Sequence, residues 1–248
     1  MLTRLPKQPS PPSTQSGFTI IECLLAIIIV SILLAAIAPV IVLSVATRVQ
    51  ARRVELGAQA ARTYIDGVRA GTIAQPNSIV VLKEVTTTGE FNPKRAAFAG
   101  VDPPNSTLPA ACSPKKSDPP KNFYCSLPVK PSATVKSLYC IDLDGSGCTG
   151  PRDLVVQSFR SVQDLTDDGS KGYLLGVRVY RADAFDGGSA LKTTQDYTKA
   201  GEPTKVATYA GGKGNQKAPL AEMTTEIRGK KMDYRSLCDR LPGTCPSR

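Results

Sequence analysis

Residues 17–47 read GFTIIECLLAIIIVSILLAAIAPVIVLSVAT, and the character of this stretch decides how the rest of the chain is interpreted. It contains one charged residue, Glu22, and the 25 residues from Cys23 to Thr47 carry no charge at all. A helix of that length reaches about 37 Å, which exceeds the roughly 30 Å hydrocarbon core of a bilayer. The stretch is therefore predicted to be a membrane-spanning helix.

Two ordinary explanations for such a stretch fit poorly. A secretory signal peptide has a shorter apolar run of about 7–15 residues, and here the only Ala-x-Ala near its end, residues 36–38, is followed by Pro39. A simple signal anchor leaves Glu22 unexplained, because a carboxylate drawn to the bilayer centre costs about 2.5–3.5 kcal/mol. We therefore expect Glu22 to have a cationic partner.

The hexapeptide Gly17-Phe18-Thr19-Ile20-Ile21-Glu22 resembles the type III signal of type IV prepilins and pseudopilins. The resemblance implies that prepilin peptidase cleaves after Gly17 and that Phe18 becomes a methylated N-terminus. It also implies that Glu22 neutralises the N-terminal ammonium of a neighbouring subunit, since opposite charges in an apolar filament core are tolerated only as a pair. Pro39 matches the proline that kinks the helix in this family.

The resemblance also implies an α+β, pilin-like fold, in which a long N-terminal helix packs on an antiparallel sheet. The predicted parts are a cleaved leader (1–17), a transmembrane or filament-core helix (18–47), an amphipathic continuation of that helix (48–71) and an extracytoplasmic globular domain (72–248). The continuation has an apolar stripe formed by Val45, Val49, Leu56, Ala60, Tyr64 and Val68. Gly71 is the predicted end of the helix.

The globular domain shows weaker patterns. Residues 93–131 contain nine prolines and are predicted to form a long irregular connecting loop. Strands are predicted at Ile79–Val85, Thr134–Leu143, Asp153–Val162 and Tyr173–Arg181, with weaker signals at Val206–Tyr209 and Met223–Ile227.

The six cysteines outside the apolar stretch are an even number, which indicates disulfides and an oxidising compartment. They are Cys112, Cys125, Cys140, Cys148, Cys238 and Cys245. Fifteen pairings are possible, and proximity in the sequence favours pairing each cysteine with its neighbour, so that Cys238 and Cys245 close a C-terminal loop. The cysteines place the domain outside the cytoplasm. The count of basic residues opposes this, because Arg4 and Lys7 precede the span whereas four arginines follow it within about 15 residues.

The segment from Asp142 to Asp153 resembles a calcium-binding loop. Asp142, Asp144 and Asp153 occupy positions 1, 3 and 12 of the calcium-loop template, and Ser146 occupies position 5. Oxygen ligands at alternate positions can surround a hard cation, and some pseudopilins bind calcium in a similar loop. The template's bidentate glutamate is missing, however, so a glycine-rich hairpin turn with solvated acids remains the alternative.

No catalytic set can be assembled from the sequence. The chain has no histidine and no Gly-x-Ser-x-Gly element, so an enzyme is not expected, and no cofactor other than calcium is indicated. The net charge of +10 favours anionic neighbours, such as phospholipid headgroups, acidic polysaccharide or nucleic acid, although the basic residues are scattered.

Three stretches, SLYCID (137–142), DLVVQ (153–157) and GVRVYRAD (176–183), resemble pseudopilins linked to hormogonium polysaccharide secretion in filamentous cyanobacteria. The expected function is that of a structural subunit whose filament serves polysaccharide secretion and gliding motility. Its expected partners are other pilins or pseudopilins, prepilin peptidase, the inner-membrane assembly platform and the plasma membrane. The alternatives are a minor tip subunit that binds anionic polysaccharide, DNA or surfaces, and a membrane-anchored domain that never polymerises.

Overall fold

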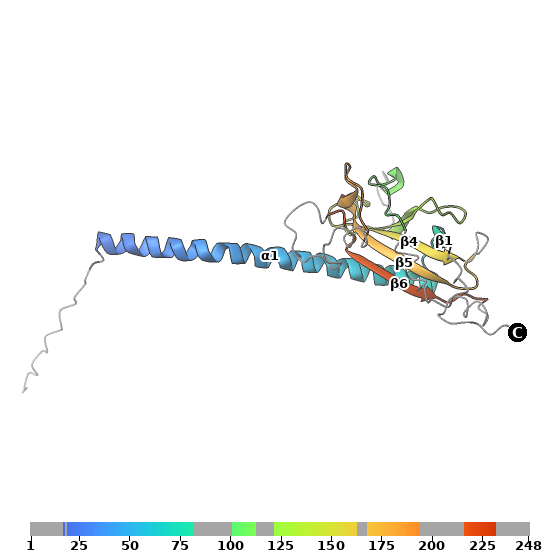
Figure 1. Cartoon of the computed structure of the whole chain (residues 1–248), viewed down its shortest axis with the longest axis horizontal. Coiled ribbons are helices and arrows are strands. Elements are labelled where there is room, and N and C mark those ends of the chain that lie inside the picture. The colour runs from blue at the N-terminus through green and yellow to red at the C-terminus, as the bar shows by residue number, and fades with distance from the viewer. Residues whose placement is uncertain are drawn as a thin grey trace, which may run out of the picture. The chain divides into compact units, whose positions relative to one another are not determined.

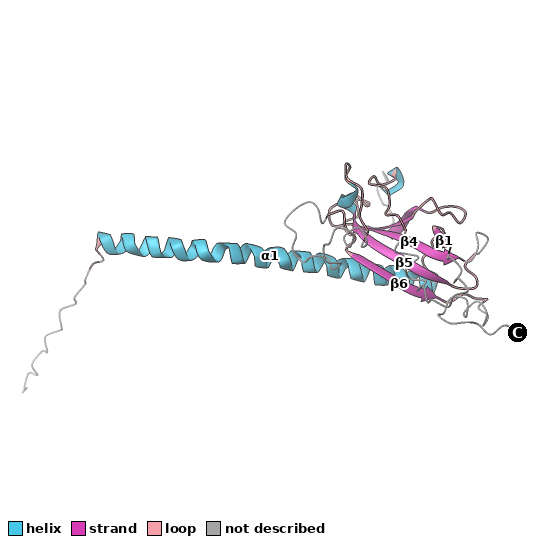
Figure 2. Cartoon of the chain, viewed as in Figure 1, coloured by secondary structure: helices cyan, strands magenta, loops and turns pink. Residues whose placement is uncertain are grey.

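The computed structural model describes residues 17, 19–81, 101–112, 122–162, 168–193 and 216–231. Its elements in chain order are α1 (Ile20–Ala70), β1 (Ile79–Val81), the 3-10 helix η1 (Ala110–Cys112), β2 (Asn122–Ser126), β3 (Ser137–Ile141), β4 (Leu154–Val162), β5 (Tyr173–Arg181), the 3-10 helix η2 (Ala182–Phe185) and β6 (Ala221–Ile227) (Figure 1, Figure 2). One long helix and a mostly antiparallel sheet confirm the α+β prediction. Residues 1–16, Phe18, the weak strand signal at Val206–Tyr209 and the loop of Cys238 and Cys245 lie outside the described residues.

The helix α1 is long because its sequence has few helix-breaking residues before Gly71. It continues through Pro39, which has no amide hydrogen, so the carbonyl of Ala35 loses its usual helical partner. The kink expected there stays a prediction. The helix ends at Ala70, and Gly71 follows with a φ of 75°, a conformation that costs little only for glycine. The predicted stop at Gly71 is therefore confirmed.

The chain divides into two compact units between Thr47 and Arg48, within α1. In the second unit, the buried stripe of α1 consists of Gly57, Ala60, Ala61, Tyr64, Ile65 and Val68. The predicted stripe was wrong at its start, because Val45, Val49 and Leu56 are 57%, 46% and 40% exposed. The close contact begins at Gly57, where an added Cβ would lie 2.7 Å from the Cβ of Leu220. Burial therefore follows the reach of the sheet, and not hydrophobicity alone.

The sheet has the strand order β2-β3-β4-β5-β6, with neighbouring strands antiparallel, and β1 pairs with β4 in parallel. Figure 1 shows β4, β5 and β6 lying side by side. The prediction missed β2, because Asn122–Ser126 falls inside the proline-rich region 93–131 that was expected to be irregular. The prolines flank these residues without interrupting them, so a five-residue strand fits between.

The two faces of the sheet bury different clusters. The face toward α1 packs Leu154, Val156, Leu175, Val177 and Val179 against the helix stripe. The opposite face buries four cysteines with Val155, Tyr180 and Phe185. Because successive strand residues point to opposite faces, β4 and β5 bury side chains on both sides of the sheet, and these include polar ones such as Gln157 and Arg178 together with the apolar ones.

A tyrosine cluster joins α1 to the sheet. The Tyr64 and Tyr124 hydroxyls lie 2.5 Å apart, and the Tyr64 hydroxyl also donates to Ser158 Oγ at 2.8 Å. The Tyr124 hydroxyl donates to the carbonyl of Ala74 at 2.7 Å. The ring of Tyr139 completes the cluster, with its centroid 5.3 Å from that of Tyr64. Buried hydroxyls that find partners in this way fix the helix in one position on the sheet.

A buried arginine on the outer face of the sheet holds the segment 101–112. Arg178 is fully buried and donates to the carbonyl of Val101 at 2.5 Å, and its Nε lies 3.3 Å from a carboxylate oxygen of Glu222. Its guanidinium also lies 5.3 Å from the ring centroid of Phe159. An arginine tolerates such burial only when paired with an acid and with carbonyls, as it is here.

Candidate functional site

The start of α1 is built around Thr19. The Glu22 amide donates to the Thr19 carbonyl at 3.1 Å and to its Oγ1 at 3.4 Å, and the Cys23 amide donates to the same carbonyl at 3.2 Å. Thr19 therefore acts as the N-cap of the helix, with Glu22 at the third helical position, which is the Thr-x-x-Glu arrangement of a capping box. The cap places the beginning of the helix, Ile20, three residues after Gly17, the predicted cleavage position.

The three-residue spacing from Thr19 gives Glu22 the position of the acid in a capping box, which the sequence interpretation missed; the contact that the structure shows is the one from the Glu22 amide to Thr19 Oγ1. An acid in the first helical turn is stabilised by the helix dipole. Within the described residues, Glu22 is exposed and has no ion-pair partner. A capping role and the expected pairing with a neighbouring N-terminus are compatible. Glutamine at this position distinguishes them, because it can cap the helix but cannot neutralise an ammonium group.

The apolar part of α1 is fully accessible in the isolated chain. All large aliphatic side chains from Ile20 to Val45 are between 46% and 82% exposed. The helix is long and apolar enough to cross a membrane, and none of its most apolar window is buried within the protein. A continuous surface of this kind is unstable in water, so it requires lipid or other protein as its surroundings.

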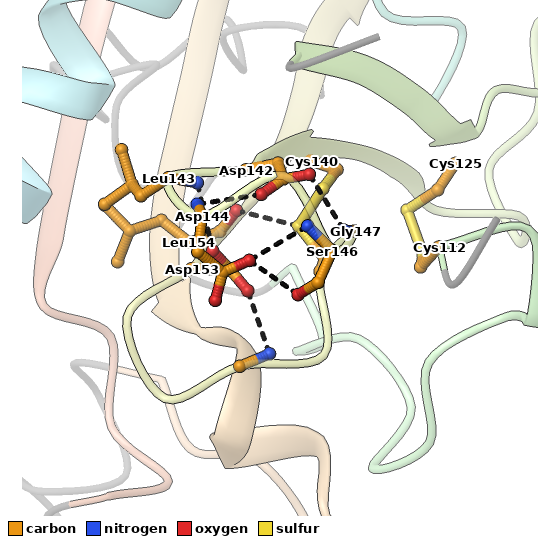
Figure 3. Close-up of a disulfide and its surroundings, with 12 residues drawn as sticks. Cys112, Cys125, Cys140, Asp142, Leu143, Asp144, Ser146, Gly147, Asp153 and Leu154 are labelled. Carbon is orange, nitrogen blue, oxygen red and sulfur yellow. Dashed lines mark hydrogen bonds between the residues drawn. A yellow bond between two sulfur atoms is a disulfide. The ribbon is translucent and has the colours of Figure 1, made fainter. Parts of the chain in front are cut away.

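A second candidate site lies in the loop between β3 and β4. The carboxylates of Asp142, Asp144 and Asp153 offer oxygens that all lie within 4.8 Å of one another, and Figure 3 shows them gathered around the loop. Asp142 and Asp153 are buried, whereas Asp144 is exposed. The structure therefore brings together the three acids that the sequence placed in one site.

Six loop amides already bind these carboxylates. Asp142 Oδ1 accepts the amides of residues 144 and 145, and its Oδ2 accepts that of residue 147 at 2.8 Å. Asp153 accepts the amides of residues 143 and 150, and Asp144 Oδ1 accepts both the amide and the hydroxyl of Ser146. Ser146 therefore donates to Asp144 through both its amide and its hydroxyl. Among the described residues, no donor reaches Asp144 Oδ2.

The acids differ in their electrostatic surroundings. Burial raises the pKa of Asp153 above its ordinary value, and the nearby negative charges of Asp144 and Asp142 add to the increase. The hydrogen bonds from Ser146 lower the pKa of Asp144. The loop therefore concentrates negative charge with no cationic side chain bonded to it in the described part, which is chemistry that suits a hard cation. The same amide bonds also satisfy the acids without a cation, so calcium binding stays a prediction.

Two disulfides brace this loop (Figure 3). Cys140 bonds to Cys148 across the loop, and Cys112 bonds to Cys125, which links η1 to β2. These are two of the three pairings that proximity in the sequence favours. The Cys148 amide donates to the carbonyl of Cys112 at 2.9 Å, so the two bridges are tied to each other. Cys23, in the apolar part of α1, is a free thiol.

Comparison with known proteins assigns the N-terminal region. Residues 12–38 match the family model of the prokaryotic N-terminal methylation motif, so the chain carries a prepilin-type signal. The matched range contains Gly17, Phe18 and Glu22. No curated protein and no solved structure gave a significant match.

Proposed function

We propose that the chain is a structural subunit, a pseudopilin or minor pilin, of a type IV pilus-like or type II secretion-like filament. The observation that carries the proposal is the methylation motif at residues 12–38, which supports a pilin or pseudopilin subunit that prepilin peptidase processes. Cleavage after Gly17 leaves Phe18 as the methylated N-terminus. The motif also favours a structural subunit over an enzyme.

The fold supports the same proposal. The apolar helix and the motif support membrane anchoring, and the exposed aliphatic surface is suited first to lipid and later to the helices of neighbouring subunits. In this account, Glu22 is the acid that pairs with the N-terminal ammonium of a neighbour when the helix leaves the membrane, because both charges must be compensated in an apolar core.

We assign the globular unit to the extracytoplasmic side of the plasma membrane. Two disulfides among the described residues support this orientation, because disulfides persist in oxidising compartments. The orientation is opposite to that expected from the arginines after the span. Protease treatment of intact spheroplasts tests it: the globular unit should be digested, and complete protection would contradict the assignment.

Substitutions of Glu22 separate its two roles. Glutamine keeps a side chain that can complete a capping box with Thr19 whereas alanine does not, and both substitutions remove the negative charge. If charge pairing is required, Glu22→Gln and Glu22→Ala should both abolish filaments while membrane insertion is retained. Glu55→Gln, on the exposed face of the same helix, is the control and should assemble normally. Normal filaments from Glu22→Gln would contradict the pairing, and would favour a domain that uses Glu22 only as a cap.

The filament's task is a finer proposal, namely polysaccharide secretion and gliding motility. It is supported by the likeness of residues 137–142, 153–157 and 176–183 to pseudopilins of that system. A strain without this protein should export markedly less polysaccharide and lose gliding, and the wild-type chain should restore both. Normal export in that strain would contradict the proposal.

The basic net charge of +10 favours a second candidate, a scarce tip subunit that binds anionic polysaccharide, DNA or surfaces. Copy number separates the two candidates. A shaft subunit should be abundant in purified filaments relative to the other pilins, whereas a tip subunit should be present at a few copies per filament.

A further inference from the structure

The hairpin formed by β2 and β3 has an unusual feature at each end. At one end lies the turn of residues 127–136, and at the other end lies a groove beside α1. The turn exposes a large aliphatic side chain to water, and the groove is lined with apolar side chains. The residues that directly follow Val129 in the turn and Leu143 in the groove, Lys130 and Asp144, carry opposite charges.

The turn presents Val129, which is 96% exposed and is the most exposed large hydrophobic residue in the described part of the chain. Val129 is exposed although two hydrogen bonds fix the turn to Asn77. The carbonyl of Pro128, directly before Val129, accepts a hydrogen bond from the Asn77 side chain at 2.8 Å, and the Ser132 amide donates to the Asn77 carbonyl at 2.8 Å. Lys130, the next residue, is also exposed. The turn is therefore a fixed projection that presents the apolar side chain of Val129 and, next to it, the positive charge of Lys130.

The groove has a volume of about 190 Å³, and its apolar walls come from Leu56, Ala60, Ile141, Leu143 and Leu154. Leu143 and Leu56 are 53% and 40% exposed, so apolar side chains reach the rim of the groove, where they alternate with the exposed polar residues Gln59, Thr63 and Asn122. Asp144, the exposed acid of the β3–β4 loop, directly follows Leu143. The groove is thus an apolar depression with a carboxylate next to it.

The positions of the two features fix how they can meet. The groove is lined by Asn122 and Ile141, which pair with each other at the open end of the β2–β3 hairpin, whereas the projecting turn of residues 127–136 closes the other end. At about 3.3 Å per strand residue, the five-residue strands separate the two features by roughly 15 Å. A projection and a groove at opposite ends of one hairpin do not contact each other within a chain, but they can join copies head to tail. Contacts of this heterologous kind generate open filaments.

We propose that Val129 of one copy docks in the groove beside Leu143 of the next copy, with Lys130 facing Asp144 across the contact. This inference rests on the proposed filament function and names the surface through which the globular units join. The occupant is a second copy because the charge next to the projection is opposite to the charge next to the groove, and because the two features lie at opposite ends of one hairpin, where they can join copies head to tail.

Cysteine cross-linking in assembled filaments tests the contact. In a Cys23→Ser background, the full-length chain carrying Val129→Cys and Leu143→Cys is expressed in its own cells, and filaments are treated with a short bismaleimide that reacts with free thiols only. A head-to-tail contact should give a ladder of dimers, trimers and higher multimers. The matched control pairs Leu143→Cys with Val135→Cys, which lies in the same turn and is 48% exposed. The control should give no ladder.

The outcomes separate this inference from the function on which it rests. Filaments without a ladder would overturn the docking contact and leave the filament function standing. A product that stops at the dimer would indicate an isologous contact and would also overturn it. If the Cys23→Ser parent forms no filaments although its N-terminus is processed, both proposals fail.

Charge reversal provides an independent test of the polar part of the contact. Lys130→Glu should reduce the cross-linked multimers several-fold, and Lys130→Glu combined with Asp144→Lys should restore them. Lys136→Glu makes the same change of charge elsewhere in the turn and should leave the ladder unaltered. Equal losses for Lys130→Glu and Lys136→Glu would show that only net charge matters, which would contradict the assigned pair.

Discussion

The two parts of α1 on either side of Thr47 are stabilised in different ways. In residues 20–47, large aliphatic side chains cover every face and remain exposed in the single chain. In residues 48–70, the buried stripe includes Gly57, Ala60 and Ala61, and the exposed residues are mostly charged or polar, with Val49 and Leu56 as large apolar exceptions. The more hydrophobic part is therefore the one that buries nothing within its own chain.

This difference separates two sources of stability. The second part is held by the sheet, so its burial is complete when one chain folds. The first part can be buried only by lipid or by other copies, so it adds to stability only when the chain inserts into a membrane or assembles. A substitution in one part should therefore affect a different measurement from a substitution in the other.

The largest effect is expected at Tyr64. Tyr64→Ala removes a buried ring and leaves the Ser158 and Tyr124 hydroxyls without their partner, so the free energy of unfolding should fall by about 3–5 kcal/mol. Ile28→Ala, at a 57% exposed position in the first part, should change it by less than about 0.5 kcal/mol. Denaturant unfolding of the detergent-solubilised chain, followed by near-UV circular dichroism of the tyrosines, measures both. Equal effects would remove the distinction between the two parts.

The next effect concerns the disulfides. Replacing both Cys140 and Cys148 by serine removes a bridge with a sequence separation of 8, and the lost constraint on the unfolded chain should cost about 2–3 kcal/mol. Cys23→Ser makes the same chemical change at the free thiol of the first part. It should leave the unfolding midpoint of the globular unit unchanged. A shift for Cys23→Ser as large as that for the double serine variant would contradict the distinction between the two parts of α1.

The globular unit should also lose stability in alkali. Burial raises the pKa of Tyr64, Tyr124 and Tyr173 above the ordinary value of 10.0, in Tyr173 to about 12. The folded state then holds these protons more tightly than the unfolded state, so stability is fully present below pH 10 and declines as the pH rises above it. Tyr64→Phe should make the decline shallower. Residues 20–47 contain no tyrosine, so their helical circular dichroism in detergent should not change over this range.

The smallest effect is that of calcium on the loop of Asp142, Asp144 and Asp153. A site with a dissociation constant of about 0.1–1 mM would add about 1.4–2.7 kcal/mol of stability at 10 mM calcium. Asp144→Asn should reduce the gain, whereas Asp168→Asn, outside this loop, should not. An unfolding midpoint of the wild-type chain that does not move with calcium would show that the loop amides alone satisfy these acids.

The sequence predicted the features that rest on continuous patterns. The apolar run at 23–47, the stop at Gly71 and strand β5 at Tyr173–Arg181 were all visible, because each depends on residues close together in the chain. Strand β2 was missed because the surrounding prolines dominated the composition of its region. The exposure of Val49 and Leu56 could not be predicted, because it depends on how far the sheet reaches along the helix.

The candidate sites were also predictable only where they depend on residues close together in the sequence. The acids of the β3–β4 loop were placed together by their spacing, but the amide bonds that engage them come from the backbone path and are invisible in a residue pattern. The capping-box spacing of Thr19 and Glu22 was visible in the sequence and was overlooked. The projection at Val129 and the groove at Leu143 had no sequence signal, since an isolated aliphatic residue is common on surfaces.

The central claim is that this chain becomes a filament subunit only after its leader is removed. Intact-mass and N-terminal analysis of the protein purified from its own cells tests it most directly. The account predicts a mature chain that begins at Phe18 with a methyl group on its amino nitrogen. A chain that retains Met1 in assembled, functional material would contradict it.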